Sequence, residues 1–381
     1  MMNLLPQQLS AKEKLQQYKV GAFFMEPGTG KTRPVVELTN EIEPDYVAYF
    51  APFQCLNSEK ESETTQFEVS KWGGFKCAHD FIGIESIQNS DRTYLDIYKK
   101  LNYAKKAVII VDESLKIKNG EAKRTKRLLE LSRLANYKLI LNGTPISKNL
   151  LDLKPQMDFL SPTILNMSLS EFKNHFCEYK KMTIRKPGTW KARSKEWIVK
   201  YHNLDYLYKL IEPYIYECSL DLQIGKQYVN IDFELQEEEK ERHQNILDTI
   251  LNNEWLMAKP NFFLELTQKL QNNYSRSFDK FEVLGQILSK NHSSKVLVFA
   301  KYIETQEALK NKFPLVKILS YQKHSFGLNL QAYNRIVFFD KIWDYALREQ
   351  AERRIFRTGQ TDECIFYDLT GNVGLEKMID K

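Results

Sequence analysis

The chain has 381 residues, of which 43% are hydrophobic and 27% charged, so it can bury a core and is not intrinsically disordered. Fifty-five Lys and Arg residues against 49 Asp and Glu residues give a net charge of +6. That mild excess permits a nucleic-acid partner without requiring one. The length corresponds to two or three domains of about 150 residues each.

The cysteine and histidine positions exclude the usual zinc motifs. No two of the five cysteines lie close enough for a CxxC pair, and no histidine pairs with a cysteine or carboxylate at metal-ligand spacing. The segment MMNLLPQQLS lacks the charged and apolar regions of a secretory signal, and apolar runs stay far short of the roughly 20 residues of a membrane span. We therefore expect a cytoplasmic protein with no zinc and no membrane association.

Short apolar runs predict buried β-strands in two groups. Their residues are mostly β-branched or aromatic, without the alternation of half-exposed strands, which is typical of parallel strands covered on both faces. Helical stretches such as 125–135 and 305–313 separate them, so we predict an α/β fold with parallel sheets flanked by helices. The predicted strands are 20–25, 45–51, 106–112 and 137–143, then 295–301, 315–320, 334–340 and 363–369.

The middle of the chain, about 151–290, has mainly helical periodicity. Residues 180–201 depart from it, because they alternate like two strands around Pro187 and Gly188. We expect a basic β-hairpin there.

The segment EPGTGKT at 26–32 follows a predicted strand and precedes a predicted helix, which is the context of a phosphate-binding loop. Gly28 and Gly30 would let backbone amides approach phosphates at the helix N-terminus. Lys31 would reach the β- and γ-phosphates, and the Thr32 hydroxyl would hold Mg²⁺. The alternative is an ordinary glycine-rich turn between a strand and a helix.

A second motif, KAVIIVDES at 106–114, ends an apolar strand in two acids. Asp112 would hold Mg²⁺ and Glu113 would polarise the attacking water. The alternative is an acidic pair that caps a helix. Lys31 and Asp112 lie 81 residues apart, a separation compatible with neighbouring strands of one nucleotide-binding sheet.

Two further segments continue the series. LILNGTPIS at 139–147 is a predicted strand that ends in a turn, and QAERRIFRTGQ at 350–360 places Arg354 and Arg357 three residues apart, on one face of a predicted helix. Arginines in that position could act on the γ-phosphate from a second lobe. The alternative is a solvated basic helix end.

The order of these blocks resembles the Swi/Snf-like branch of helicase superfamily two, the DNA-translocating ATPases. LLPQQ at 4–8 looks like that family's adenine-reading segment, and VDESLKIKN at 111–119 is similar to its second motif. The resemblance continues through the blocks 26–32, 50–53, 141–153, 296–302 and 326–360. It implies two RecA-like lobes with ATP and Mg²⁺ as cofactors.

The resemblance also assigns residues to roles. The implied catalytic residues are Lys31, Asp112, Glu113, Arg354 and Arg357, and the implied Mg²⁺ ligands are Thr32 and Asp112. The implied ATP-contacting residues are Gln8, Gly28, Thr29, Gly30, Lys31, Thr32, Gly327 and Gln350.

The chain departs from the family pattern in three places. Met25 replaces the first glycine of the phosphate loop, Ser114 and Leu115 replace the usual Ala-His pair, and the segment between the fourth and fifth motifs is short. We expect a first lobe at 1–215, in which 151–215 is the helical and hairpin insertion, and a second lobe at 216–381. In the second lobe, 216–290 would be mainly helical and 291–381 a shortened core. Residues 152–181 look most like compact phage-encoded members of the family.

Basic residues mark two candidate DNA-binding stretches, 116–138 and 180–200. In the second, tryptophans alternate with basic residues, which suits a surface that follows a nucleic-acid backbone. A solvated charged face is the alternative for both. The residues we expect to contact DNA are Lys186, Lys191, Arg193 and Lys195.

The leading expectation is an ATP-dependent translocase that acts on duplex or branched DNA, with replication or recombination proteins of a phage as possible partners. In that case it would work in the cytoplasm of the host. One alternative is a strand-separating DNA helicase. Others are a DNA-binding or partner-recruiting module with weak ATPase activity and a subunit of a restriction or defence complex.

Overall fold

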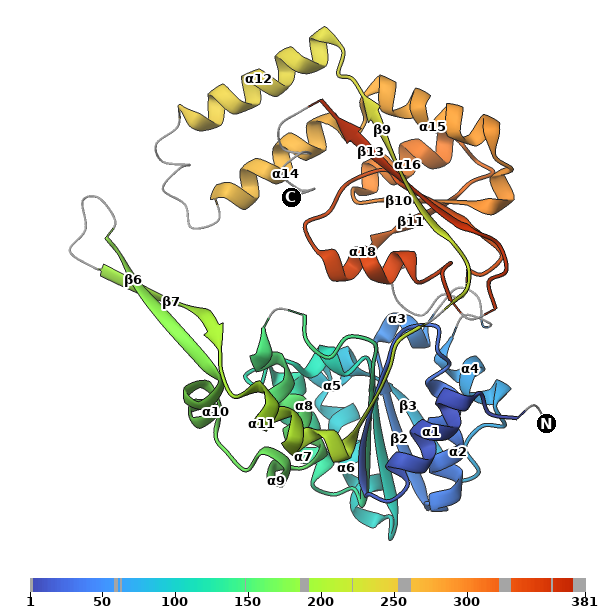
Figure 1. Cartoon of the computed structure of the whole chain (residues 1–381), viewed down its shortest axis with the longest axis vertical. Coiled ribbons are helices and arrows are strands. Elements are labelled where there is room, and N and C mark those ends of the chain that lie inside the picture. The colour runs from blue at the N-terminus through green and yellow to red at the C-terminus, as the bar shows by residue number, and fades with distance from the viewer. Residues whose placement is uncertain are drawn as a thin grey trace. The chain divides into compact units, whose positions relative to one another are not determined.

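The computed structural model describes residues 3–57, 61, 64–147, 149–185, 192–220, 222–252, 262–321, 330–357 and 359–372. The chain forms two compact units, Met1–Leu220 and Asp221–Lys381 (Figure 1). Among the described residues, no helix combines the length and apolar character needed to cross a bilayer.

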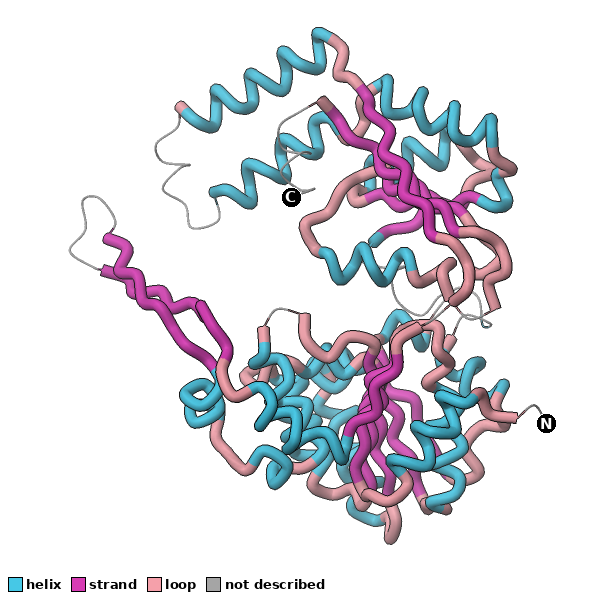
Figure 2. Tube along the Cα trace, viewed as in Figure 1, coloured by secondary structure: helices cyan, strands magenta, loops and turns pink. Residues whose placement is uncertain are grey.

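The first unit is built on a six-stranded sheet in which every pairing is parallel (Figure 2). The order across the sheet is β3-β2-β4-β5-β1-β8. The strands are β1 (Val20–Met25), β2 (Tyr46–Ala51), β3 (Ala78–Gly83), β4 (Ala107–Asp112), β5 (Tyr137–Asn142) and β8 (Ile215–Cys218). The unit extends beyond the boundary expected at residue 215 because β8 pairs with β1.

Helices cover both faces of this sheet (Figure 1). On one face, Ala22, Ile109 and Ile140 of the central strands join a core cluster with helical residues such as Leu128 and Met157. The helices of the unit are α1 (Pro6–Leu15), α2 (Thr32–Ile42), α3 (Phe53–Leu56), α4 (Thr65–Lys71), α5 (Ile84–Asn89), α6 (Asp91–Tyr103), α7 (Lys123–Ser132), α8 (Leu153–Leu160), α9 (Pro162–Leu165), α10 (Leu169–Phe176) and α11 (Leu204–Ile211), with 3₁₀ turns η2 (Ser114–Ile117), η3 (Leu150–Asp152) and η4 (Glu212–Tyr214).

The predicted hairpin is confirmed as β6 (Cys177–Arg185) and β7 (Ala192–Tyr201), which pair antiparallel. It projects from the rest of the first unit (Figure 1). The register shifts between Glu178 and Tyr179, so a β-bulge interrupts the ladder near its base. The expected turn at Pro187 and Gly188 lies outside the described residues.

The second unit contains a five-stranded sheet of order β11-β10-β12-β13-β9, again with parallel pairing throughout. Together, the two sheets confirm the predicted α/β fold class. The strands are β9 (Lys226–Phe233), β10 (Val296–Ala300), β11 (Lys317–Ser320), β12 (Arg335–Phe338) and β13 (Cys364–Gly371). The helices are α12 (Glu237–Leu251), α14 (Phe262–Tyr274), α15 (Phe278–Lys290), α16 (Ile303–Lys312) and α18 (Tyr345–Glu352), with the 3₁₀ turn η5 (Ser293–Lys295).

A buried ion pair crosses the core of the second unit. Lys280 Nζ donates to Asp340 Oδ1 at 3.0 Å, and the two residues are each only 1% exposed. The other oxygen of Asp340 accepts the backbone N–H of Lys301 at 2.8 Å. Lys280 also lies over the rings of Phe233 and Phe339. Both charges are therefore compensated inside the core.

Candidate functional site

The motif residues of the first unit follow three strands that end at the same edge of the sheet. β1 leads into the 26–31 loop, β4 ends at Asp112, and β5 ends at Asn142. In parallel α/β sheets, ligands bind at the carboxyl ends of strands. β1 and β4 belong to one sheet, as the spacing allowed, but they are not neighbours, because β5 pairs with both and lies between them.

The 26–31 loop has the backbone of an anion-binding loop. Gly28 has a φ of 95° and Gly30 a φ of 81°, values that glycine adopts at little cost. Thr29 closes a tight turn, since its N–H and its hydroxyl both donate to the carbonyl oxygen of Glu26, at 3.2 and 2.7 Å. The loop then enters α2 at Thr32, so the unpaired N–H groups and positive dipole end of an 11-residue helix adjoin it.

Gln8 lies directly on this loop. Its Nε2 donates to the carbonyl oxygen of Gly30 at 3.0 Å, and its Oε1 accepts the N–H of Leu5 at 3.0 Å. A Cβ atom at Gly30 would lie only 2.3 Å from Gln8 Nε2. The carboxamide keeps one N–H and one lone pair for a ligand. The structure thus joins the N-terminal glutamine to the loop.

Asp112, at the carboxyl end of β4, is a hydrogen-bonded carboxylate with a raised pKa. Its Oδ2 accepts the Tyr49 hydroxyl at 3.2 Å, and its Oδ1 accepts the backbone N–H of Glu113 at 3.0 Å. Burial raises the pKa of the Asp112 carboxyl to about 6, against the opposing attraction of Lys31 and with a further increase from Glu113. Lys31 and Asp112 are therefore within electrostatic reach of each other.

The donor set fits a magnesium ion. Mg²⁺ prefers carboxylate and hydroxyl oxygens together with substrate phosphates. Asp112 supplies a carboxylate whose charge is poorly solvated, and Thr32 supplies a hydroxyl at the first residue of α2. A divalent cation would offset the cost of ionising Asp112.

Glu113 has an unusual backbone. Its φ of 55° and ψ of 54° lie in the left-handed region, which non-glycine residues adopt at a cost of about 1–3 kcal/mol. It precedes η2, but its side chain makes no capping hydrogen bond among the described residues. The geometry therefore argues against the acidic pair as a helix cap. Strain of this kind clusters at functional sites.

The arginines of the second unit lie beyond a helix and not on one of its faces. α18 ends at Glu352, so the prediction that Arg354 and Arg357 share a helix face is wrong. Gln360 fixes this turn: its Nε2 donates to the carbonyl oxygens of Tyr333 and Ile355, at 2.8 and 3.2 Å. The spacing of the two arginines did not reveal this turn, which follows the end of α18.

The remaining predicted residues divide by what the structure describes. Gln350 lies on α18. Gly327, Lys186 and Lys191 lie outside the described residues. Arg193 and Lys195 belong to β7, where their backbones pair with Ile184 and Met182.

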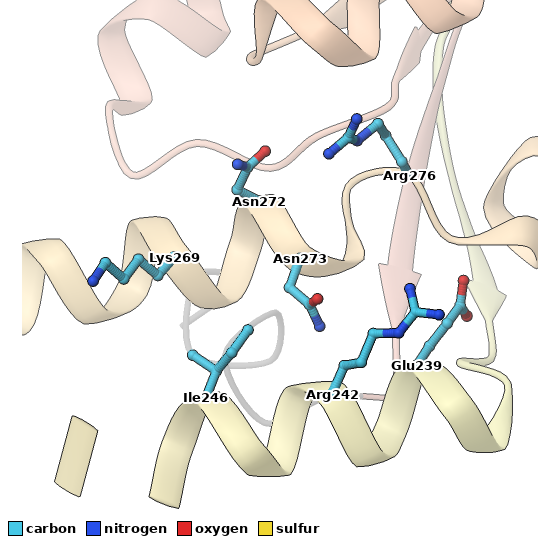
Figure 3. Close-up of a pocket in the computed structure, with 7 residues that line it drawn as sticks. All are labelled: Glu239, Arg242, Ile246, Lys269, Asn272, Asn273 and Arg276. Atoms are coloured by element: carbon cyan, nitrogen blue, oxygen red, sulfur yellow. The ribbon is translucent and has the colours of Figure 1, made fainter. Parts of the chain in front are cut away.

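A concave site lies between α12 and α14 (Figure 3). It has a volume of about 520 Å³. Two of its basic groups are already paired, Arg242 with Glu238 at 3.6 Å and Arg276 with Glu304 at 2.9 Å. Its charges are thus largely compensated, and it contains none of the predicted motif residues. The lining residues are Glu239, Arg242, Ile246, Lys269, Asn272, Asn273 and Arg276.

The loop after β1 and the acidic pair at the end of β4, at one edge of a parallel sheet, define a protein of the nucleotide-binding α/β class. Residues 70–292 match the family described as the SNF2-related domain. The chain belongs to this family, which confirms the resemblance seen in the motifs.

Curated relatives are distant and longer. An uncharacterized ATP-dependent helicase of Mycoplasma genitalium is 25% identical over 316 residues, covering 74% of this chain and 29% of the relative. The DNA repair and recombination protein RDH54 of Saccharomyces cerevisiae is 25% identical over 330 residues, covering 69% of this chain and 35% of the relative. The chain spans about a third of the length of these relatives.

A solved structure, the Sulfolobus solfataricus SWI2/SNF2 ATPase core in complex with dsDNA, aligns over all of this chain and 90% of the other. Its TM-score is 0.44 and its sequence identity 20%.

Proposed function

We propose that the protein is a DNA-dependent ATPase that moves along duplex or branched DNA. The observation that carries this proposal is the edge of the first sheet, where the glycine loop, Lys31, Asp112 and Glu113 come together. Membership of the SNF2-related family, with relatives named as an ATP-dependent helicase and a DNA repair and recombination protein, supports DNA as the partner.

In the proposed reaction, the backbone amides of the 26–31 loop and the Lys31 ammonium bind the β- and γ-phosphates of ATP. Thr32 and Asp112 would hold Mg²⁺, which when bound neutralises charge that develops on the phosphate oxygens. Glu113 orients the attacking water and accepts its proton. Gln8, which is hydrogen-bonded to Gly30, contacts the adenine through its remaining N–H group and its remaining oxygen lone pair.

The proposed role of Arg354 and Arg357 is to stabilise charge on the γ-phosphoryl group. The proposed role of Gly327 and Gln350 is to contact the nucleotide. Arg354 is only 6% exposed, and the buried Gln360 fixes the turn that carries it. Both observations support an Arg354 that is held in place and not freely solvated. These assignments depend on the order of the motifs in the sequence.

For DNA, we propose that the hairpin β6–β7 follows the phosphate backbone through Lys186, Lys191, Arg193 and Lys195. Its length and its projection from the first unit support such a contact. A role in the replication or recombination of a phage, inside its host's cytoplasm, is the most specific form of this proposal. A strand-separating helicase remains the second candidate, since hydrolysis alone does not distinguish it.

The test is ATP hydrolysis by the full chain without nucleic acid and with single-stranded, duplex and branched DNA. Strong stimulation by duplex or branched DNA, absent in Lys31→Ala, is the expected result. Hydrolysis equal in all four conditions would contradict a DNA motor. No hydrolysis in any of them, with intact DNA binding, would instead favour the DNA-binding module.

A further inference from the structure

A buried hydrogen bond links the residue after Glu113 to a helix of the insertion. The Ser114 hydroxyl donates to Gln156 Oε1 at 2.6 Å, and both residues are fully buried. Asn142, the last residue of β5, approaches the same hydroxyl, with Nδ2 at 3.4 Å. Ser114 is the first residue of η2, two residues after β4 ends, and Gln156 lies in the middle of α8. The link therefore joins elements that are far apart in the sequence.

The other end of the Gln156 carboxamide holds the loop after β5. Its Nε2 donates to the carbonyl oxygen of Pro145 at 2.7 Å and to that of Asp152 at 2.8 Å. The carboxylate of Asp152 accepts the N–H and the hydroxyl of Ser147, at 2.9 and 3.1 Å. One side chain thus connects the loop that carries Glu113 to the 143–147 loop.

The 143–147 loop also touches the phosphate loop. A Cβ atom at Gly143 would lie 2.4 Å from Cδ and 2.9 Å from Cγ of Pro27. This approach leaves no room for a side chain at Gly143, so the two loops are closely packed against each other at this point. Contacts therefore run without a break from Pro27 through Gly143 and Pro145 to Gln156 and Ser114.

Glu113 is the residue that this arrangement constrains. Its left-handed backbone is held on one side by the Asp112 carboxylate, which accepts its N–H, and on the other by the buried Ser114. Its carbonyl oxygen accepts the N–H of Lys116 at 2.9 Å. A strained conformation persists only where its surroundings fix it. Leu115 has no polar side-chain atom to supply such a link.

We propose that Ser114, acting through Gln156, is a positioning residue that holds the proposed base Glu113 in a fixed position relative to the phosphate-binding loop. This inference rests on the proposed ATP hydrolysis. It predicts that loss of the link slows the chemical step while nucleotide still binds. A purely structural hydrogen bond would lower stability and leave the chemistry of the folded protein unchanged.

The experiment compares Ser114→Ala and Gln156→Met with a matched control, Ser132→Ala, in the full chain. Ser132 is also buried, and its hydroxyl donates to the carbonyl oxygen of Leu129 on its own helix at 2.9 Å. The readouts are kcat and KM for ATP with duplex DNA, together with amide hydrogen exchange in the 112–118 and 143–147 segments.

We expect kcat to fall about tenfold in Ser114→Ala and in Gln156→Met, with KM changed less than twofold. The double variant should be no slower than the slower single variant, because both changes break one link. Ser132→Ala should keep the wild-type kcat. Exchange protection should decrease in both segments in the two link variants, and in neither segment of Ser132→Ala.

A wild-type kcat in folded Ser114→Ala and Gln156→Met would overturn the proposal, as would unchanged exchange in both segments. If Ser114→Ala does not fold, the kcat and the amide exchange of Gln156→Met test the proposal. A wild-type protein that hydrolyses no ATP with any DNA would contradict the proposed function instead. The exchange comparison would then still show whether the link fixes the two loops.

Discussion

The side chain of Gln8 donates a hydrogen bond to the backbone carbonyl oxygen of Gly30 at 3.0 Å. This contact fixes the N-terminal segment to the phosphate-binding loop, where Gly30 has a φ of 81°. The glutamine is 3% exposed, so the link is shielded from water. The conformation of the loop therefore depends on a residue that precedes the first strand.

Gln8→Ala is expected to weaken ATP binding about tenfold, because one buried hydrogen bond and the brace on the loop are lost together. Titration of a fluorescent ATP analogue measures this change. The exposed Gln17 of the same region provides the control, and Gln17→Ala should bind like wild type. Gly30→Ala should abolish binding, since a Cβ atom would collide with Gln8 in a backbone that disfavours alanine. Full binding by Gly30→Ala would contradict the loop geometry.

Asp112→Asn is expected to stabilise the metal-free, nucleotide-free protein at pH 7.5 while it abolishes hydrolysis. The pKa of Asp112 is about 6 in the folded state, above its ordinary value of about 4. The folded chain then binds the proton more tightly than the unfolded chain, so stability falls as pH rises from about 4 to 6. Because the side chain is partly exposed, the gain should be on the order of 1–2 kcal/mol.

Urea unfolding in the presence of a chelator, at pH 5 and at pH 7.5, measures this difference. The advantage of the asparagine variant should be about half as large at pH 5 as at pH 7.5, because pH 5 is the midpoint of this range. An equal difference at both pH values would show that Asp112 does not titrate in this range.

Neutralising the four predicted hairpin residues should weaken DNA binding and flatten its salt dependence. Each lost phosphate contact lowers the slope of log K against log salt by about 0.9 for duplex DNA. ATP hydrolysis without DNA should remain intact. The control replaces Lys99 and Lys105 with glutamine, since both are exposed elsewhere on the first unit. A salt slope unchanged from wild type would exclude the hairpin as the DNA contact. The tested residues are Lys186, Lys191, Arg193 and Lys195.

Removing Lys280 alone should destabilise the second unit by about 3–5 kcal/mol, because Asp340 would be left as an uncompensated buried charge. Lys280→Met combined with Asp340→Asn removes both charges and should recover much of that loss. Denaturant unfolding of the two single variants and the double variant gives the coupling free energy between Lys280 and Asp340. Additive losses would mean that the pair does not interact in the folded protein.

Strands that are buried on both faces of a sheet have a continuous run of apolar residues, and these strands could be predicted from the sequence. Two edge strands lack such a run and were missed: β3 begins with the exposed Ala78 and His79, and seven of the eight residues of β9 are exposed or half buried. A strand covered on only part of its surface lacks that run. β8 was missed because it has only four residues and follows a helical pattern.

The candidate site shows a similar limit. Its glycine loop and acidic pair each lie within a few consecutive residues, so their spacing was readable. The Ser114–Gln156 link joins two separate elements, and no local pattern specifies such a contact. In the structure, Gln156 is a polar residue on the almost wholly buried helix α8. A buried amide of this kind requires partners.

The most direct test of the account is the rate of ATP hydrolysis by Glu113→Gln with duplex DNA, alongside ATP binding by the same variant. Removing the proposed base should lower kcat at least 100-fold while ATP still binds, because glutamine keeps the shape of the side chain but accepts no proton. The exposed Glu121 supplies the control, and Glu121→Gln should behave like wild type. A Glu113→Gln variant that hydrolyses ATP at the wild-type rate would contradict the assignment of this sheet edge as the catalytic site.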